Sequence, residues 1–175
     1  NALLRFFGFS AFSDVLSNQS LRGVTWFSLW QAIISSFLTL AVALPASWAL
    51  SRYTFRGARL VRGVLTAPFV LPAVVVAAGV LAITDSRGVI PILWAHVVFN
   101  VSVVLRIVGP RWSMVNLRLE HAAATLGARP SRTFSLVVLP QISDAVISAA
   151  TLVFIYCFTS FGVIAILGGV SRRTL

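Results

Sequence analysis

The 175-residue chain is 58% hydrophobic and only 10% charged, whereas an ordinary soluble domain is about 25% charged. A water-soluble globule cannot bury so much apolar side chain, so the composition excludes a soluble domain. All 14 basic residues are arginine, against 4 acidic residues, which gives a net charge of +10. Without lysine the chain has no nucleotide-binding GxxxxGK[ST] loop, and its single cysteine excludes an internal disulfide.

Four stretches of at least 18 residues carry no formal charge: residues 23–51, 63–84, 88–105 and 145–171. A helix needs about 20 residues to cross a hydrocarbon layer about 30 Å thick. The pattern predicts an all-α membrane protein, a polytopic helix bundle with helical cores near residues 26–50, 64–83, 89–108 and 144–168. Because the charges gather between these stretches, they do not form a nucleic-acid-binding surface.

Four prolines lie within or at the ends of these stretches: Pro45, Pro68, Pro72 and Pro91. In a membrane bundle, neighbouring helices can satisfy the carbonyl group that a proline leaves free. We therefore expect helix kinks at these positions. A mobile gate at Pro68 and Pro72 is the alternative interpretation.

The connections between spans differ in their arginine content. If the spans alternate, the first and third connections share one face with nine arginines: Arg52, Arg56, Arg59, Arg62, Arg106, Arg111, Arg118, Arg129 and Arg132. The other face carries five: Arg5, Arg22, Arg87, Arg172 and Arg173. The positive-inside rule predicts that the nine-arginine face is cytoplasmic. Residues 1–20 are rich in phenylalanine but too short to span, and we expect them to lie on the outer leaflet.

About 35 residues separate the third span from the fourth. Asn116 is a suitable N-cap and Gly127 a suitable C′ residue, so residues 117–126 are predicted to form a short helix. Its apolar positions follow helical spacing and make a face with small residues at its centre: Leu119, Ala122, Ala123 and Leu126. A second short helix is predicted over residues 131–138, before Pro140 starts the last span. We expect this surface hairpin to fit a groove on another protein.

The sequence EHAAATLG at residues 120–127, with VVLP at residues 137–140, resembles a known motif. It is similar to the cytoplasmic EAA loop, E-A-A-x3-G-x9-I-x-L-P, of permease subunits of binding-protein-dependent ABC importers. His121 stands where that family usually has glutamate, and Glu120 comes one position earlier. Residues 26–32, 94–100 and 158–169 resemble the thiamine and iron(III) branch of these permeases.

The resemblance implies that residues 1–175 are one transmembrane permease domain, the second to fifth spans of a six-span half, with a coupling loop at residues 111–140. One span is then expected to be missing at each end. In the family, a helix in this loop docks on a separate cytoplasmic ATP-binding subunit. The coupling residues implied are Glu120, His121, Ala122, Ala123, Gly127, Leu139 and Pro140.

The resemblance also implies the partners and the location of the protein. They are an external solute-binding protein, a second permease half or copy, and the lipid of the bacterial inner membrane, in which the chain is multi-pass. We expect no enzyme activity, no nucleic acid and no cofactor, since the partner subunit binds ATP. Thiamine or iron(III) is the expected cargo.

Polar side chains within the spans are candidates for lining the pathway. His96 and Asn100 share one helix face, and Thr159 and Ser160 lie in the last span. The alternative is that they make hydrogen bonds between helices.

A secondary transporter driven by an ion gradient is the competing function, but it requires acidic or broken-helix sites at mid-membrane. All four acids lie outside the predicted helical cores or at their ends. An intramembrane enzyme or metal site requires clustered His, Asp, Glu or Cys, which the sequence lacks.

Overall fold

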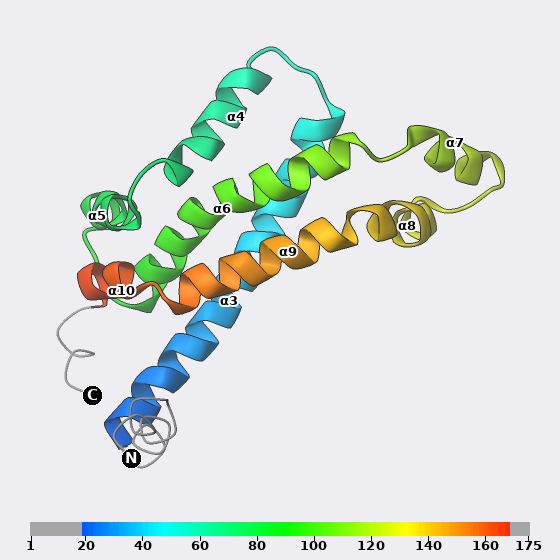
Figure 1. Cartoon of the computed structure of the whole chain (residues 1–175). Helices are drawn as coiled ribbons and strands as arrows, with labels where there is room; N and C mark the ends of the chain where they lie inside the picture. Colours follow the sequence, from blue (N-terminus) through cyan, green and yellow to red (C-terminus); the bar gives the residue numbers. More distant parts are fainter. Residues whose placement is uncertain (1–18, 169–175) are drawn as a thin grey trace, which may run out of the picture.

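A computed structural model describes residues 19–168, and every regular element in that range is a helix. Three long helices, α3 (Gln19–Arg52), α6 (Val89–Ser113) and α9 (Leu139–Phe158), pack pairwise to form the central bundle (Figure 1). The shorter helices α5 (Ala73–Thr84) and α10 (Phe161–Leu167) pack against each other and against α6. The bundle therefore has a long three-helix body and a smaller helical group at one end.

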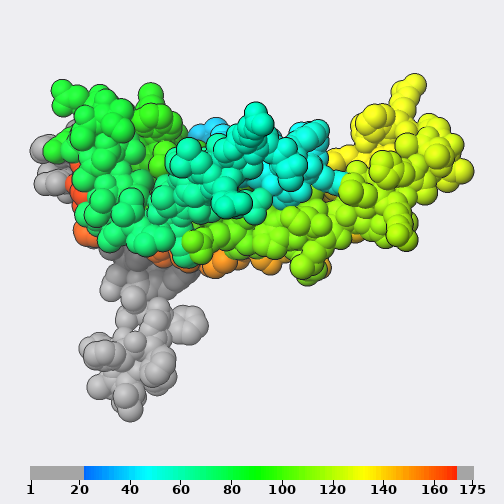
Figure 2. All heavy atoms as spheres, turned by 90° about the horizontal axis from the view of Figure 1, so that it is seen from above, coloured from blue at the N-terminus to red at the C-terminus, as the bar shows by residue number. Residues whose placement is uncertain are grey.

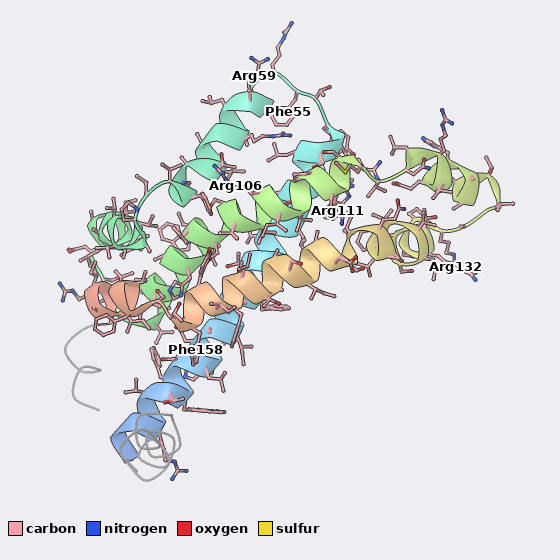
Figure 3. The ribbon with its side chains drawn as sticks, in the orientation of Figure 1. Phe55, Arg59, Arg106, Arg111, Arg132 and Phe158 are labelled. Carbon is pink, nitrogen blue, oxygen red and sulfur yellow. The ribbon has the colours of Figure 1, made fainter. Side chains whose placement is uncertain are left out.

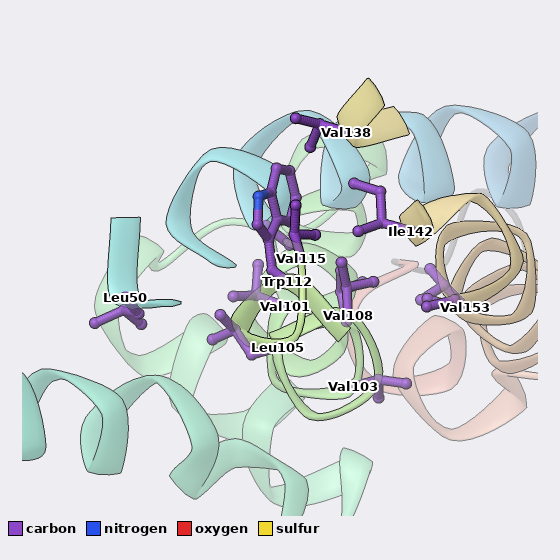
Figure 4. Packing of buried hydrophobic residues seen from close by; sticks show 14 of the residues in the cluster. Leu50, Val101, Val103, Leu105, Val108, Trp112, Val115, Val138, Ile142 and Val153 are labelled. Atoms are coloured by element: carbon purple, nitrogen blue, oxygen red, sulfur yellow. The ribbon is translucent and has the colours of Figure 1, made fainter. Parts of the chain in front are cut away.

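The main apolar core fills the space between α3, α6 and α9 (Figure 4). Val104 and Val108 on α6 and Val153 on α9 are fully buried in it. Trp112, near the end of α6, closes the core with only 4% of its surface exposed. A second cluster, which includes Ala77, joins α5, α10 and the start of α6.

The distribution of polar and apolar side chains on α3 is the reverse of that on a helix in a soluble protein. Gln31, Ser35 and Thr39, spaced four residues apart, are fully buried. On the outer surface, Phe37 is 71% exposed and Ile33 is 53% exposed. Lipid is as apolar as these outer side chains, whereas small and hydroxyl side chains let helices approach closely and bond to each other. This arrangement agrees with the predicted membrane bundle.

Three helices are long and apolar enough to cross a membrane: Arg22–Arg52, Val89–Ser113 and Pro130–Phe158. The first and third predicted spans are thus confirmed as continuous helices. The second predicted span, residues 64–83, is not one helix. Helix α4 (Ala58–Thr66) continues into a short 3-10 turn, η1 (Ala67–Phe69), and meets α5 after a bend of 110°. Counting this bent pair as one span gives the expected four.

The prolines explain the bend in the second span. Pro68 lies in η1, and Pro72 precedes α5 with extended backbone angles of φ −56° and ψ 137°. Each proline lacks an N–H donor and disfavours helical geometry in the residue before it. Two prolines four residues apart therefore interrupt the helix completely, where we had expected kinks.

The fourth predicted span also differs, because its helix begins earlier and ends sooner than residues 144–168. The predicted second loop helix is continuous with α9 through α8 (Pro130–Thr133) and a π-helical turn, η2 (Phe134–Val138). The turn ends two residues before Pro140, and its wider hydrogen bonding avoids the clash that a proline ring makes with an α-helical carbonyl. At the other end, the helix stops at Phe158, and residues 159–160 separate it from α10.

The turn at residues 53–57 and the loop at residues 114–129 lie at the same end of the bundle (Figure 1). In Figure 3, Arg59 lies at the start of α4, Arg111 near the end of α6 and Arg132 on α8, whereas Phe158 lies towards the opposite end. The two arginine-rich connections therefore share one face, as the alternation of spans predicts. Residues 1–18, most of the predicted interfacial segment, lie outside the described residues.

Candidate functional site

The loop between α6 and α9 contains a short helix, α7 (Leu117–Thr125), that is capped at both ends. Asn116 Oδ1 accepts a hydrogen bond from Arg118 N at 3.0 Å. At the other end, Gly127 has φ +78°, and its N–H and that of Ala128 bond back to the helix carbonyls at 3.0 Å. A side chain at this left-handed position would be strained, so glycine is the natural residue there. Both predicted caps are confirmed.

Most of the predicted small-residue face of α7 is accessible. Ala122 is exposed, Ala123 is half-buried, and Leu119 and Leu126 are 50% and 87% exposed. Figure 2 shows the segment from α7 to α8, yellow-green to yellow, projecting from one end of the molecule. Apolar side chains on a projecting helix have the character of a contact surface.

An ion pair ties α7 to the membrane helices. Arg52, in the last turn of α3, donates to the carboxylate of Glu120, and the two side chains are only 14% and 26% exposed. Gln141 on α9 accepts a hydrogen bond from the backbone of Asn116 at 3.3 Å. Helix α7 is therefore held to both α3 and α9, and it is not a free arm.

The remaining predicted coupling residues lie near α7 or just beyond it. His121 is exposed and borders a groove of about 620 Å³ between α3, α7 and the α8–α9 helix. Leu139, 40% exposed, lines the same groove. Pro140 is exposed and stands in the first turn of α9, two residues after the end of the π-helical turn. These residues face solvent or the groove, and none belongs to the buried core.

The polar residues predicted to line the pathway form a second site inside the bundle. Gln31 Nε2 donates to His96 Nδ1 at 2.7 Å, so the imidazole carries its proton on Nε2. That nitrogen donates to Ser160 Oγ, also at 2.7 Å. Ser35 Oγ lies 3.2 Å from His96 Nδ1. One imidazole thus links α3, α6 and the break between α9 and α10.

All four predicted pathway residues line one pocket of about 440 Å³: His96, Asn100, Thr159 and Ser160. The pocket lies where the two interrupted helix pairs, η1–α5 and α9–α10, meet α6. The hydrogen bonds between helices that we considered as the alternative are also present, since His96 makes both kinds of contact.

Several residues that shape these sites were given no such role from the sequence. Gln31 and Ser35 were not assigned as partners of His96, although two polar residues four apart in an uncharged span are a usable signal. Arg52 was counted only among the nine arginines of the predicted cytoplasmic face, and its pairing with Glu120 joins residues 68 apart. In the described residues, no group of three or more His, Cys, Asp or Glu side chains is placed to hold a metal ion.

Comparison with known proteins shows what the chain is similar to. The thiamine transport system permease protein ThiP of Brucella abortus strain 2308 is 30% identical over 171 residues, which cover 86% of this chain and 32% of that protein. ThiP of Salmonella typhimurium strain LT2 is 27% identical over 183 residues, 94% of this chain and 34% of the relative. The chain is a homologue of bacterial transport permeases.

A second kind of relative agrees with this assignment. The sulfate transport system permease protein CysT of Salmonella typhimurium is 28% identical to this permease chain over 178 residues, 92% of the chain and 64% of the relative. No protein-family model matches the chain. The permease chain spans about a third of the length of the thiamine relatives above.

These relatives confirm the resemblance to permease subunits of binding-protein-dependent ABC importers, thiamine branch. Together with the apolar helices, they identify the permease chain as a multi-pass protein of the bacterial inner membrane. The relatives carry the names of transport proteins and not of enzymes, which agrees with the expected function class. Their names include thiamine and sulfate, so they do not single out the iron(III) branch.

Proposed function

We propose that this permease chain forms part of the solute pathway of an importer and that α7 couples the pathway to a separate cytoplasmic ATPase. The observation that carries the proposal is the capped, projecting helix α7, held to the end of α3 by the Arg52–Glu120 pair. The proposed docking residues are Glu120, His121, Ala122, Ala123 and Gly127, and Leu139 and Pro140 fix the return of the loop to the membrane helix.

The physical argument concerns how ATP hydrolysis can move helices in the membrane. Closure of two ATPase subunits can act on the permease only through a stiff element that both proteins hold. Coupling also requires that α7 contacts the ATPase differently in its open and closed states, because equal contacts would shift no equilibrium. A helix with satisfied ends and two separate ties to the bundle has the required stiffness.

The proposal includes the partners. An external binding protein delivers the solute, a second permease half or copy completes the pathway, and the ATPase, not this chain, binds ATP. The cargo is proposed to be thiamine or iron(III), and His96, Asn100, Thr159 and Ser160 are proposed to line its path. An ion-driven transporter is less well supported, because no acidic residue lines the described pocket.

The docking of α7 is tested by substitutions on its exposed surface. Ala122→Trp should leave the fold intact, because Ala122 is exposed, but should block the seating of α7 in a groove of the ATPase. Gly127→Asp should disrupt the C-terminal cap, because a residue other than glycine is strained at φ +78°. We expect both full-length variants to insert into membranes normally, to lose co-purification with the ATPase, and to lose solute uptake.

A second, family-like variant on the same helix is His121→Glu. It restores the residue usual in the family, and the exposed position can accept a carboxylate without a burial penalty. We expect this variant to retain both ATPase binding and uptake. Normal co-purification and uptake by Ala122→Trp would show that α7 is not the docking element.

A further inference from the structure

Helix α4 has two distinct sides. Arg59, Arg62 and Thr66 fall on one side, because they are spaced three and four residues apart, and Leu60 and Val64 fall on the opposite side. Leu60 is 72% exposed and Val64 is 62% exposed. Since α4 belongs to the bent second span, we expect lipid to cover these apolar side chains.

The arginine side of α4 is turned towards the bundle. Arg62 Nη2 donates to the carbonyl oxygen of Leu50, on α3, at 2.8 Å. Leu65, three positions after Arg62, packs against the main core. Arg59 lies at the start of α4, at the end of the bundle that carries the arginine-rich connections, here called the arginine-rich end (Figure 3). Arg62 therefore lies along the seam between α4 and the bundle, and Arg59 lies at the end of that seam.

Helix α6 brings a third arginine to the same region. Arg106 lies seven residues before Ser113, the last residue of α6, which is about 10 Å along the helix axis. It is exposed, and its Cζ lies 4.5 Å from the centroid of the Phe69 ring in η1. Because η1 directly follows α4, Arg106 lies beside the far end of α4 (Figure 3). A charged side chain at such a depth in a span is costly unless it has a partner.

These three arginines have no counter-ion in the part of the chain that the structure describes. Glu120 pairs with Arg52, and none of the three makes an ion pair with a described carboxylate. The ring of Phe69 compensates Arg106 only in part, because a ring face offers no oxygen acceptor to the five N–H groups of a guanidinium. The region therefore attracts an anion that is not one of the described side chains.

An anionic phospholipid is the partner that these surroundings fit. Arginine donates paired N–H groups to phosphate oxygens, and clusters of basic side chains beside a span attract anionic lipids. The exposed apolar side of α4 offers a surface for the acyl chains of the same lipid. A dissolved oxyanion would gain the same hydrogen bonds but no contact with Leu60 and Val64.

We propose that Arg59, Arg62 and Arg106 bind the headgroup of an anionic phospholipid, whose acyl chains lie against Leu60 and Val64. The three side chains are accessible to such a lipid, since all three residues are exposed. A lipid held there joins α4 to α6 at the point where the second span bends. The inference depends neither on the cargo nor on the docking of α7.

The test measures lipid binding to the full-length permease with its ATPase partner, in detergent micelles, by native mass spectrometry. Phosphatidylglycerol is the probe, and zwitterionic phosphatidylcholine is the reference. We expect phosphatidylglycerol to bind more tightly than phosphatidylcholine, and Arg106→Gln and Arg59→Gln each to weaken its binding by about fivefold. Arg132→Gln is the matched control, because it removes the same charge from α8, on the projecting hairpin. It should leave phosphatidylglycerol binding unchanged.

Two further measurements identify the partner of Arg106 and the source of the anion. Phe69→Leu removes the ring but keeps the arginine, so phosphatidylglycerol binding should be retained. Sodium sulfate should displace the lipid no more than sodium chloride does at the same ionic strength, since the proposed ligand is a lipid and not a free oxyanion.

Four results would overturn the inference. They are equal binding of the two lipids, wild-type binding by Arg106→Gln, an equal loss in Arg132→Gln, and specific displacement of the lipid by sulfate. If Arg106→Gln does not insert into membranes, Arg59→Gln decides in its place, because Arg59 is exposed at the start of α4 and its replacement should not disturb the fold.

Discussion

At the scale of single residues, Arg52 and Glu120 make the contact with the clearest functional consequence. The pair joins the last turn of α3 to the first turn of α7. Both side chains are mostly buried, so solvent screens them less than a fully exposed pair. Glu120 also lies near the N-terminus of its helix and Arg52 near the C-terminus of its own, where each charge is favourable. The pair therefore stabilises the seating of α7.

We expect Arg52→Gln to weaken that seating by about 1 kcal/mol, the upper end for partly exposed pairs. In the purified full-length protein this corresponds to a fall in Tm of about 2–4 °C. The double variant Arg52→Glu with Glu120→Arg should recover most of the loss, though not all, because glutamate is disfavoured at the end of α3.

Arg56→Gln is the control for that experiment, since Arg56 is an exposed arginine of the following turn. Its Tm should be unchanged. Equal losses in Arg52→Gln and Arg56→Gln would indicate a general effect of net charge, and no recovery in the double variant would show that the pair does not hold α7.

Residue roles could be predicted from the sequence where the signal was local. Asn116 and Gly127 were found because caps depend on residues within one turn of each other. The partner of Glu120 was not found, because the pairing with Arg52 depends on how α3 and the loop meet in space. For the same reason, His96 was recognised as a candidate while Gln31, its neighbour on α3, was not.

At the scale of helices, the close contact between α5 and α10 positions the wall of the pocket. A Cβ atom added at Gly162 would lie 2.9 Å from Cγ2 of Val74. The two helices can therefore approach each other only because residue 162 is glycine. This contact is what holds the interrupted pairs η1–α5 and α9–α10 together at the pocket.

We expect Gly162→Ala to destabilise the full-length protein by about 1–3 kcal/mol through overpacking, which a lower Tm would report. Adding Val74→Ala should restore stability, since it removes the clashing methyl group. Gly79→Ala is the matched control in α5, where an added Cβ meets nothing within 4 Å. It should raise stability by about 0.8–1 kcal/mol through helix propensity. An unchanged Tm in Gly162→Ala would show that the contact between α5 and α10 is looser than in the structure.

Helix type was predictable, and helix continuity was not. Uncharged length identified α3 and α6, because burial in lipid requires a continuous apolar helix. Pro68 and Pro72 signalled a disturbance, but whether a proline kinks or ends a helix depends on what satisfies the freed carbonyls nearby. At Pro140 the sequence predicted a boundary between two helices, whereas the structure has one continuous helix there. The π-helical turn before Pro140 keeps that helix intact.

At the scale of the whole molecule, the two arginine-rich connections lie at one end of the bundle, and the turn around Ser86 lies between α5 and α6 at the other. Arginine counts predict that the first of these ends is cytoplasmic. Phe55, Ser86 and Thr125 are all exposed. Phe55 and Thr125 lie at the arginine-rich end, and Ser86 lies at the other.

We expect single cysteines at these positions to report the orientation. A membrane-impermeant maleimide should label Ser86→Cys in spheroplasts, and should label Phe55→Cys and Thr125→Cys only after the membrane is opened. Cys157 is fully buried and should not interfere. If Phe55→Cys and Thr125→Cys were labelled from different sides of the membrane, the two arginine-rich connections would not lie at the same end. If all three cysteines were labelled from the sides opposite to those expected, the orientation of the chain would be the reverse of the one assigned.

The uninterrupted helix from Pro130 to Phe158 has a mechanical consequence for the molecule. Its α-helical part beyond the π-helical turn, the 20 residues of α9, makes a rod about 30 Å long at about 1.5 Å per residue. One end of α9 leads through η2 and α8 to the hairpin, and the other stops beside Thr159 and Ser160, which border the pocket. A tilt of about 5° around its midpoint displaces each tip of α9 by about 1.3 Å in opposite directions. We therefore expect α9 to act as a lever, so that a pull on the hairpin moves the opposite end of the helix, where the pocket lies.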